Sequence, residues 1–561
     1  MTLNKNTFLL LLVSLALLSS CSRKKKNVAA GYIPADASAV VAINAHQLMN
    51  KLGKDSITLQ KLSMLVMGPM ADTATNPTVF WSGAETSGVD FKEPVYISLN
   101  IPSKITDQNA VLRIIVQLKN REQFAKTIDI LDGDVSKEKD FTYITTDESA
   151  IGFNNKTAIY VAHLNADAIT GTKTTGIFSL DSLDDVPEPP DFTGKMALEL
   201  VKSSFSLQKE NSLAGNDDFD ELPIGDNDMK MWANYTTGIE KMLKGNLAEA
   251  AVVLRRLLTN SYSASVINFE NGAIKGTSRM YFSKESAEVV KKAASKNIDL
   301  SAVSAFPGKT LNTYIGMAFD PAMMRHIIEY IKWDGAANMG LSLIGLSLDD
   351  FLNALTGEVS IIFADAGTLP AGNAMGGPVN SANWAAVARI NNTPALEKIL
   401  NNKKVLDSLK KTGSYYVMEK DSTRIYFNIK NNNLYVGGNP QLLAQFMDGT
   451  KKNDFASGPL ARFSKNPFGL YMSTSGLSTA GAFSPRLPLL SSSFSEMTVT
   501  GQHFEKNFLQ SNMEMMLPNK QKNALSVVFN TLLSQMQSEL RLVMPKEDEE
   551  FMPPLVPMEV K

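Results

Sequence analysis

The chain has very few of the residues that build metal sites and disulfides. It contains one cysteine and four histidines in 561 residues. A single cysteine excludes an intrachain disulfide and any zinc site that needs several thiolates. Fifty-five basic side chains against 57 acidic ones give a net charge of −2. Because there is no basic excess to neutralise phosphates, we expect no nucleic-acid partner.

The sequence also lacks the short motifs of several common enzyme classes. It has no His-Glu-x-x-His zinc motif, no dinucleotide-binding glycine fingerprint, no Walker A loop and no Gly-x-Ser-x-Gly elbow. The composition is that of an ordinary globular protein, with 44% hydrophobic and 20% charged residues. From the sequence we predict no catalytic residue, no metal ligand and no cofactor site, and a non-enzymatic role is favoured.

The N-terminus carries a short apolar run and the only cysteine. Lys5 precedes a largely apolar stretch over residues 8–18, which has the length of a signal-peptide core and is too short to span a bilayer. Leu18-Ser19-Ser20-Cys21 then resembles the lipobox of bacterial lipoproteins. That resemblance implies that residues 1–20 are removed and that Cys21 is acylated, which anchors the chain to a membrane. The alternative is a plain secretory signal with Cys21 near the cleavage point by chance.

The residues after Cys21 are basic, and we interpret residues 21–30 as a tether. Four cations, Arg23 to Lys26, either form a solvated linker or lie beside anionic headgroups at about 1 kcal/mol each. Surface-exported lipoproteins of Bacteroides-type bacteria usually carry acidic residues at this place. The basic tether therefore favours the outer membrane facing the periplasm, and the cell surface is the alternative.

The second half of the sequence repeats the pattern of the first. The matching positions are Asn44 and Asp320, Phe124 and Leu396, and Phe153 and Phe427, at offsets of 276, 272 and 274 residues. Near-constant offsets predict an internal duplication, although two generic patterns in chance register would look similar. The fold class we predict is α+β, with two similar tandem modules over residues 31–300 and 301–545 and a disordered tail over 546–561. Each module is expected to be a mainly antiparallel sheet with helices packed on it.

An extra segment near residues 215–258 distinguishes the first module. It begins with an acidic stretch and continues into an expected helix over 237–258. The acidic side chains are Asp217, Asp218, Asp220, Glu221, Asp226 and Asp228. They could bind calcium, but they do not follow the EF-hand spacing. We interpret the segment as a solvated helical insertion.

Two further patterns suggest sites. Ser206-Leu207-Gln208-Lys209, Ser295-Lys296-Asn297 and Lys411-Thr412-Gly413 match the order of motifs in penicillin-recognising enzymes, a match that composition alone can produce. The four tryptophans could stack on sugars. For Trp333, which follows an apolar helical stripe, we expect packing in the core or between the modules.

The start of the mature chain is similar to a known family. Ile33-Pro34-Ala35-Asp36-Ala37 and the strand over residues 40–44 resemble the opening of Bacteroides-type lipoproteins catalogued as domain of unknown function 4836. The resemblance implies an envelope lipoprotein and supplies no catalytic residues. We therefore expect a non-enzymatic envelope lipoprotein that binds a protein or glycan partner. The alternative is a periplasmic or surface hydrolase of glycan or peptide that uses a carboxylate pair roughly 5–10 Å apart.

Overall fold

The computed structural model describes most of the chain after the tether. The described residues are 28–52, 87–101, 109–128, 133–165, 192–236, 255, 257–291, 296–342, 345–365, 383–402, 409–420, 423–449, 452–475 and 493–531. The predicted signal peptide, Cys21 and the predicted tail lie outside these residues.

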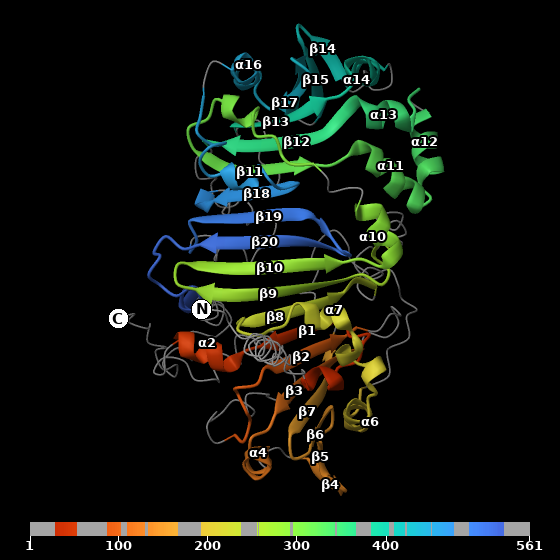
Figure 1. The fold of residues 1–561 in the computed structure, drawn as a ribbon, viewed down its shortest axis with the longest axis vertical. Coiled ribbons are helices and arrows are strands. Elements are labelled where there is room, and N and C mark those ends of the chain that lie inside the picture. The colour runs from red at the N-terminus through yellow and green to blue at the C-terminus, as the bar shows by residue number, and fades with distance from the viewer. Residues whose placement is uncertain are drawn as a thin grey trace, which may run out of the picture.

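The described strands form one antiparallel sheet of 20 strands that runs the length of the molecule (Figure 1). We call β1 to β10 the N-terminal half and β11 to β20 the C-terminal half. The first ten strands are β1 (Ala39–Ile43), β2 (Val95–Asn100), β3 (Asn109–Gln117), β4 (Asp134–Glu138), β5 (Phe141–Thr145), β6 (Ser149–Phe153), β7 (Thr157–Asn165), β8 (Met229–Asn234), β9 (Tyr262–Glu270) and β10 (Ala273–Tyr281). The other ten are β11 (Leu311–Ala318), β12 (Leu355–Ala364), β13 (Asn383–Ile390), β14 (Leu409–Thr412), β15 (Tyr415–Lys420), β16 (Thr423–Lys430), β17 (Asn433–Gly437), β18 (Phe468–Ser473), β19 (Glu496–Glu505) and β20 (Phe508–Met516).

The two halves have the same strand connectivity. From its outer edge to the centre, the N-terminal half runs β4-β5-β6-β7-β3-β2-β1-β8-β9-β10. The C-terminal half runs β14-β15-β16-β17-β13-β12-β11-β18-β19-β20. The halves join where β10 pairs with β20, with Ala273 opposite Met516 and Tyr281 opposite Phe508. The predicted α+β class and antiparallel sheet are confirmed, but the sheet is continuous rather than divided between modules.

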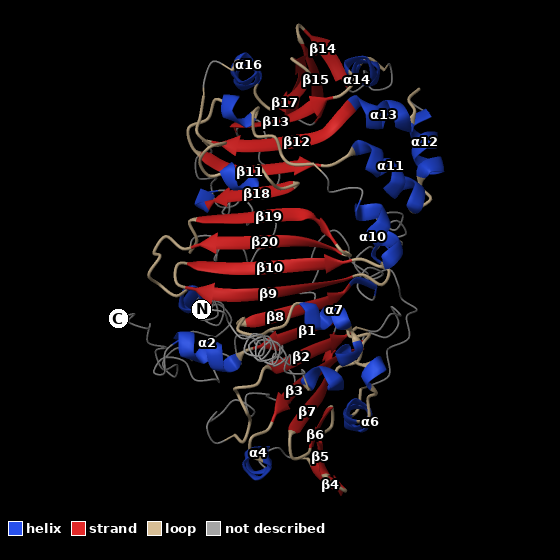
Figure 2. Cartoon of the chain, in the orientation of Figure 1, coloured by secondary structure: helices blue, strands red, loops and turns tan. Residues whose placement is uncertain are grey.

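Helices cover the two faces and the ends of the sheet (Figure 2). In the N-terminal half they are α2 (Ala45–Leu52), α4 (Arg121–Ile128), α6 (Gly194–Phe205), α7 (Asp217–Glu221) and α10 (Lys284–Lys291), with the 3-10 turns η1 (Ala29–Tyr32), η4 (Lys209–Asn211) and η5 (Leu213–Gly215). In the C-terminal half they are α11 (Pro321–Tyr330), α12 (Asp334–Ser342), α13 (Leu348–Ala354), α14 (Thr393–Leu400) and α16 (Pro440–Asp448), with η7 (Val303–Ala305) and η9 (Ala461–Phe463).

Local sequence signals set several of these boundaries. Asn439 caps α16 by accepting hydrogen bonds from the backbone of Gln441 and Leu442, and Pro440 occupies the first turn. The Asn439-Pro440 sequence therefore fixes the start of α16. The hairpin between β16 and β17 turns at Asn431 and Asn432, which both have a positive φ near 50°.

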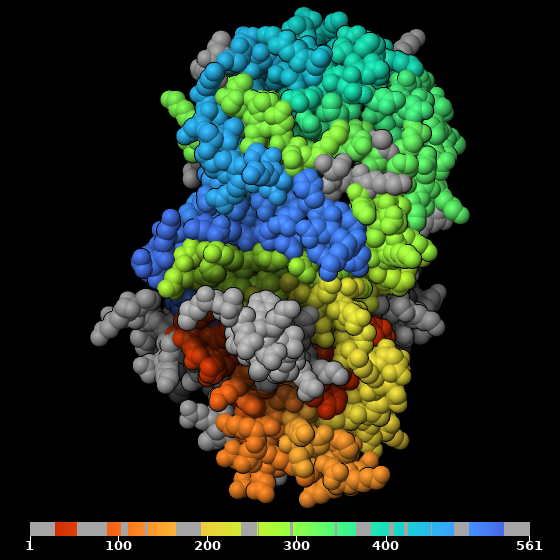
Figure 3. All heavy atoms as spheres, viewed as in Figure 1, coloured from red at the N-terminus to blue at the C-terminus, as the bar shows by residue number. Residues whose placement is uncertain are grey.

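The final helix of each half packs toward the other half. Residues 524–531 form a helix after β20, and Ala524 and Leu525 are buried in the core beneath α2 and β1 of the N-terminal half. Likewise, Ala287 and Val290 of α10 in the N-terminal half are buried with Met323 of α11 in the C-terminal half. Figure 3 shows the halves as two lobes joined through this central region. The core of the N-terminal half is therefore completed by residues of the C-terminal half, which also has two buried clusters of its own.

The expected insertion near 215–258 is wrong in its central part. Residues 229–234 form β8, which pairs with β1 and β9 inside the sheet. Its counterpart in the C-terminal half is β18, which pairs with β11 and β19. The segment therefore contains an ordinary sheet strand, and most of the expected helix over 237–258 lies outside the described residues.

Candidate binding pocket

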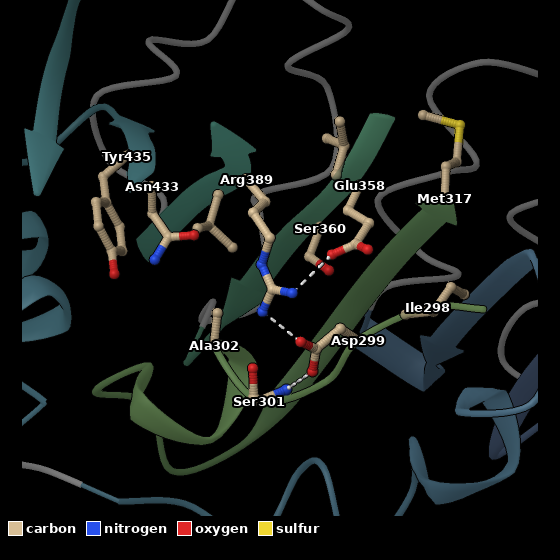
Figure 4. A pocket seen from close by; sticks show the side chains of 12 residues that line it. Ile298, Asp299, Ser301, Ala302, Met317, Glu358, Ser360, Arg389, Asn433 and Tyr435 are labelled. Atoms are coloured by element: carbon tan, nitrogen blue, oxygen red, sulfur yellow. Dashed lines mark hydrogen bonds and ion pairs between the residues drawn. The ribbon is translucent and has the colours of Figure 1, made fainter. Parts of the chain in front are cut away.

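A polar pocket opens on one face of the C-terminal half. Its volume is about 150 Å³, and it lies between the strands β12, β13 and β17 and the segment of residues 298–302 that precedes η7. We call this side of the sheet the pocket face. The side chains that give it its chemistry are Asp299, Glu358, Ser360, Arg389, Asn433 and Tyr435 (Figure 4).

Arg389 is the centre of the pocket. Its guanidinium pairs with Asp299 through Nη2 and lies 3.4 Å from Oε2 of Glu358 through Nη1. Figure 4 shows the guanidinium between these two carboxylates. The group of three carries one net negative charge. Because 44% of the Arg389 side chain is exposed, an incoming ligand can reach the guanidinium.

The Asp299 carboxylate is held in its charged form. Burial would raise the pKa of Asp299, but hydrogen bonds from Ser301 and the charge of Arg389 outweigh it and hold the pKa below its usual range. The backbone N–H of Ser301 donates to Oδ1 of Asp299 at 2.8 Å. Asp299 is thus an acceptor with a fixed orientation.

Aromatic and hydroxyl groups form the floor of the pocket. Tyr435 is buried, and burial raises the pKa of its hydroxyl above the usual value. The hydroxyls of Tyr314 and Ser360 lie 3.1 Å apart beneath the pocket, and burial raises the pKa of Tyr314 to about 12. These hydroxyls remain protonated at neutral pH, so they add hydrogen-bonding groups without adding charge.

The N-terminal half has a neutral pair of side chains at the matching place. In that half Gln117 of β3 lies opposite Thr157 of β7, and in the C-terminal half Arg389 of β13 lies opposite Asn433 of β17. The helix caps Asn120 and Asn392 follow Gln117 and Arg389 by three residues in each half. The hydroxyl of Thr157 is buried and donates to Oε1 of Gln117 at 3.4 Å. The same sheet position therefore holds a neutral, internally bonded pair in one half and a partly exposed arginine in the other.

The size of the pocket limits what it can hold. Pockets that enclose drug-sized ligands usually measure about 300–1,000 Å³. A pocket of about 150 Å³ admits one small polar unit, such as a single sugar ring or one residue of a peptide. Carboxylates, an amide, hydroxyls and a guanidinium offer both acceptors and donors to such a unit.

None of the pocket residues was predicted from the sequence. Arg389 and Asn433 stand in strand patterns that alternate in the ordinary way, and Asp299 is 90 residues from Arg389. One signal was available: at the matching strand positions, the neutral Gln117 and Thr157 of the first half are replaced by arginine and asparagine in the second. Comparing the repeats position by position would have found it.

Three of the six acidic side chains predicted to be solvated are bonded to other parts of the protein. Asp218 accepts a hydrogen bond from the Tyr262 hydroxyl, and Glu221 lies 3.1 Å from Nζ of Lys506. Asp228 is fully buried and pairs with Lys51 at 2.6 Å. The interpretation as a solvated insertion is wrong for these residues. Among the described residues, no group of three or more His, Cys, Asp or Glu side chains could hold a metal ion.

The pieces of the penicillin-type pattern are not brought together. The Ser206 hydroxyl donates to the backbone oxygen of Lys202 at the end of α6, and Lys209 lies in η4. Lys411 and Thr412 belong to β14, at the outer edge of the other half. Ser295 lies outside the described residues, as does Cys21, the predicted lipidation site.

The tryptophans have different environments. Trp232 is buried and stacks on Tyr262 with ring centroids 4.3 Å apart, so it is a core residue. Trp384 is half-buried beside Phe363 on the face opposite the pocket. Trp333 is 43% exposed, which contradicts the expectation that it packs in the core or between the modules. Trp81 lies outside the described residues.

A known protein family is similar to the N-terminal part of the chain. Residues 30–178 match the family described as Domain of unknown function (DUF4836). This similarity covers well under half of the chain. No curated protein matches it. In the described residues, no helix is long and apolar enough to cross a bilayer.

Three solved structures are weakly similar to the chain. Their titles describe crystal forms I, III and IV of TP0453, and they share 8%, 9% and 9% sequence identity with this chain. Each covers 46% of this chain, while 81%, 84% and 83% of the respective structures are covered. The TM-scores are 0.22, 0.24 and 0.21, so the likeness carries no argument about fold or function.

Proposed function

We propose that this protein is a non-enzymatic lipoprotein of the cell envelope that binds one residue of a glycan in the Arg389 pocket. Acylated Cys21 anchors it in the outer membrane, facing the periplasm. The observation that carries the binding role is the difference between the halves. Arg389 and Asn433 line a polar pocket at the position where Gln117 and Thr157 bond to each other in the N-terminal half.

The chemistry of the pocket favours a sugar over an apolar group. Sugar hydroxyls both donate and accept, and the pocket offers acceptors on Asp299 and Glu358 and donors on Arg389. Tyr435 adds an aromatic side chain at one side of the pocket (Figure 4). A sugar ring that bonds to this pocket need not break the ion pairs of Arg389, because each carboxylate retains free lone pairs.

The state of the carboxylates supports binding rather than hydrolysis. A glycosidase of the two-carboxylate type needs a general acid whose pKa is raised. The pKa of Asp299 is instead held below its usual range. Both Asp299 and Glu358 are engaged with one guanidinium.

The equal connectivity of the two halves supports a tandem duplication followed by divergence. Both halves place ten strands in the same order, and the helix after the tenth strand crosses to the other half in each case. A duplicated unit can keep one copy as a scaffold while the other gains a charged binding site. We assign the N-terminal half the first role and the C-terminal half the second.

The binding role is tested with a glycan array probed by the purified, detergent-solubilised protein. We expect saturable binding to a subset of glycans, reduced in Arg389→Ala and retained in Arg424→Ala. Arg424 is a suitable control because it forms an exposed ion pair with Glu419, 2.7 Å away and outside the pocket. Equal binding by both variants would show that the pocket is not the glycan site.

The anchor is tested separately by the intact mass of protein extracted from native membranes. Acylated Cys21 adds the mass of the acyl chains, and metabolic labelling with palmitate is lost in Cys21→Ser. Digestion by protease added to intact cells would contradict the periplasmic orientation. An unmodified sulfur on Cys21 would contradict the anchor itself.

A further inference from the structure

Helix α12 is unusual among the described α-helices because none of its residues is buried. It spans Asp334–Ser342 and projects at the side of the sheet, next to α11 and α13 (Figure 1). The backbone N–H of Leu348 donates to Oδ1 of Asn338 at 3.2 Å, which fixes α12 against the start of α13. The helix is therefore held in place without being covered by the described residues.

Large apolar side chains are exposed along this helical region. Trp333 before α12 is 43% exposed, Met339 on α12 is 66% exposed, and Phe351 on α13 is 52% exposed. They are three of the eight exposed large hydrophobic residues of the described chain, and they lie within 19 residues of one another. We call helix α12 together with these three residues the α12 surface. Such a concentration on adjacent elements marks an interaction site rather than ordinary surface.

The α12 surface has very little charge. Residues 333–348 contain one charged side chain, Asp334, in a protein of which 20% is charged. The neighbouring acids of α13 are neutralised, because Asp349 pairs with Arg325, and Asp350 pairs with Lys398 at 2.8 Å. A solvent-exposed helix with so few charges is poorly suited to water and has few groups for specific recognition of a protein partner.

We propose that the α12 surface lies in the interfacial region of the bilayer and forms the second membrane contact of the protein. This inference rests on the proposed lipid anchor, which keeps the body of the protein close to the membrane. Tryptophan prefers the boundary between headgroups and acyl chains, and a short apolar helix can lie in that plane without spanning the bilayer. Two contacts, the acyl chains and the α12 surface, would fix the orientation of the long sheet relative to the membrane.

The test uses the full-length processed lipoprotein with a fluorophore at Met339. Because Cys21 is the only natural cysteine and is expected to be acylated, Met339→Cys introduces the only free thiol for labelling. The labelled protein is reconstituted in vesicles of phosphatidylethanolamine with a minority of phosphatidylglycerol. Some of the vesicles contain lipids with a spin label on the acyl chain, which quench a fluorophore that enters the bilayer. Val135→Cys is the matched control, because Val135 is 60% exposed on the edge strand β4 at the far end of the sheet.

We expect quenching by the spin-labelled lipid at position 339 and none at position 135. An aqueous emission spectrum at 339 without lipid quenching would overturn the proposal. A blue shift of the fluorophore at position 339 that occurs without lipid and disappears on dilution would also overturn the proposal. It would indicate that a second copy of the chain, rather than the bilayer, covers the α12 surface. Two labels per molecule in the mass spectrum would mean that Cys21 is free, and the anchor would fail. The quenching at 339 would then be measured in the Cys21→Ser background, where its presence or absence still decides the role of the α12 surface.

Discussion

At position 389 a guanidinium takes the place of the neutral Gln117 side chain at the matching position of the other half. The change adds a positive charge to the pocket face, and Asp299 and Glu358 supply the compensation. Because the Arg389 side chain is 44% exposed, solvent screens these ion pairs. We expect their contribution to stability to be below about 1 kcal/mol, so the arrangement is better explained by binding than by stability.

Arg389→Ala should change the acid dependence of stability. The folded-state pKa of Asp299 lies below its unfolded value of about 3.9, so its interactions stabilise the protein above about pH 4 and are lost as the pH falls. Arg389→Ala removes one of the groups that lower the pKa of Asp299, so this variant lacks part of the pH-dependent stabilisation. The difference in urea midpoint between wild type and Arg389→Ala should therefore be largest near neutral pH and shrink below about pH 4. A difference that grows on acidification would contradict this assignment.

The buried Lys230 leads to a second prediction, in which stability changes at neutral to alkaline pH rather than at acidic pH. It is buried on β8, and burial lowers the pKa of its ammonium group to about 7, while Asp220 partly opposes the shift. The unfolded chain then binds more protons than the folded one between about pH 7 and about pH 10, so stability rises with pH in that range.

Lys230→Met should remove this slope and stabilise the protein at neutral pH by about 1–4 kcal/mol, because a buried charge is replaced by a side chain of similar length. Chemical denaturation at several pH values compares the two proteins. Destabilisation at every pH would show that the bond from Lys230 to the backbone oxygen of Phe219 outweighs the cost of burial.

At the scale of single elements, helix starts and hairpin turns follow from local sequence. Asn392 and Asn439 each cap a helix whose first turn contains a proline, as their sequence pattern indicates. Asn439→Ala should lower the free energy of unfolding by about 1 kcal/mol, and Asn439→Ser should restore most of it, because serine also accepts from the first-turn N–H groups. Equal loss in both variants would mean that Asn439 acts through packing instead.

Two elements were misjudged for physical reasons. Residues 229–234 follow an acidic stretch, so we interpreted them as part of an insertion. They form a strand because they pair with β1 and β9, and no local sequence pattern indicates that pairing. Trp333 follows the apolar stripe of α11, yet Lys332 has a positive φ of 57° and ends the helix before it. The chain therefore turns and Trp333 leaves the buried side.

At the scale of the whole molecule, the two halves have equal strand orders, but the sequence offsets gave no indication of the shared core. Phe494 and Leu517 of the C-terminal half are buried among residues of the N-terminal half. Repeats in a sequence reveal similar units and do not reveal which unit a helix packs against. The expected boundary near residue 300 therefore separates two patterns of sequence rather than two independent cores.

A fragment of residues 31–300 should not fold alone. It lacks β20 and the helix over 524–531, so its central edge strand β10 and the apolar side chains beneath residues 524–531 would face water. We expect poorly dispersed NMR spectra for the fragment and recovery of a folded complex when it is co-expressed with residues 301–545. A cooperative thermal transition in the isolated fragment would contradict the shared core.

The claim that the C-terminal half carries the binding site is tested most directly by calorimetric titration. A glycan that the wild-type protein binds on the array is titrated into wild type, Arg389→Ala, Arg424→Ala and Gln117→Ala, the last at the matching position of the N-terminal half. We predict one site per chain, at least about tenfold weaker binding in Arg389→Ala and unchanged affinity in the other two variants. Full affinity in Arg389→Ala, or two equal sites per chain, would contradict the division of roles between the halves.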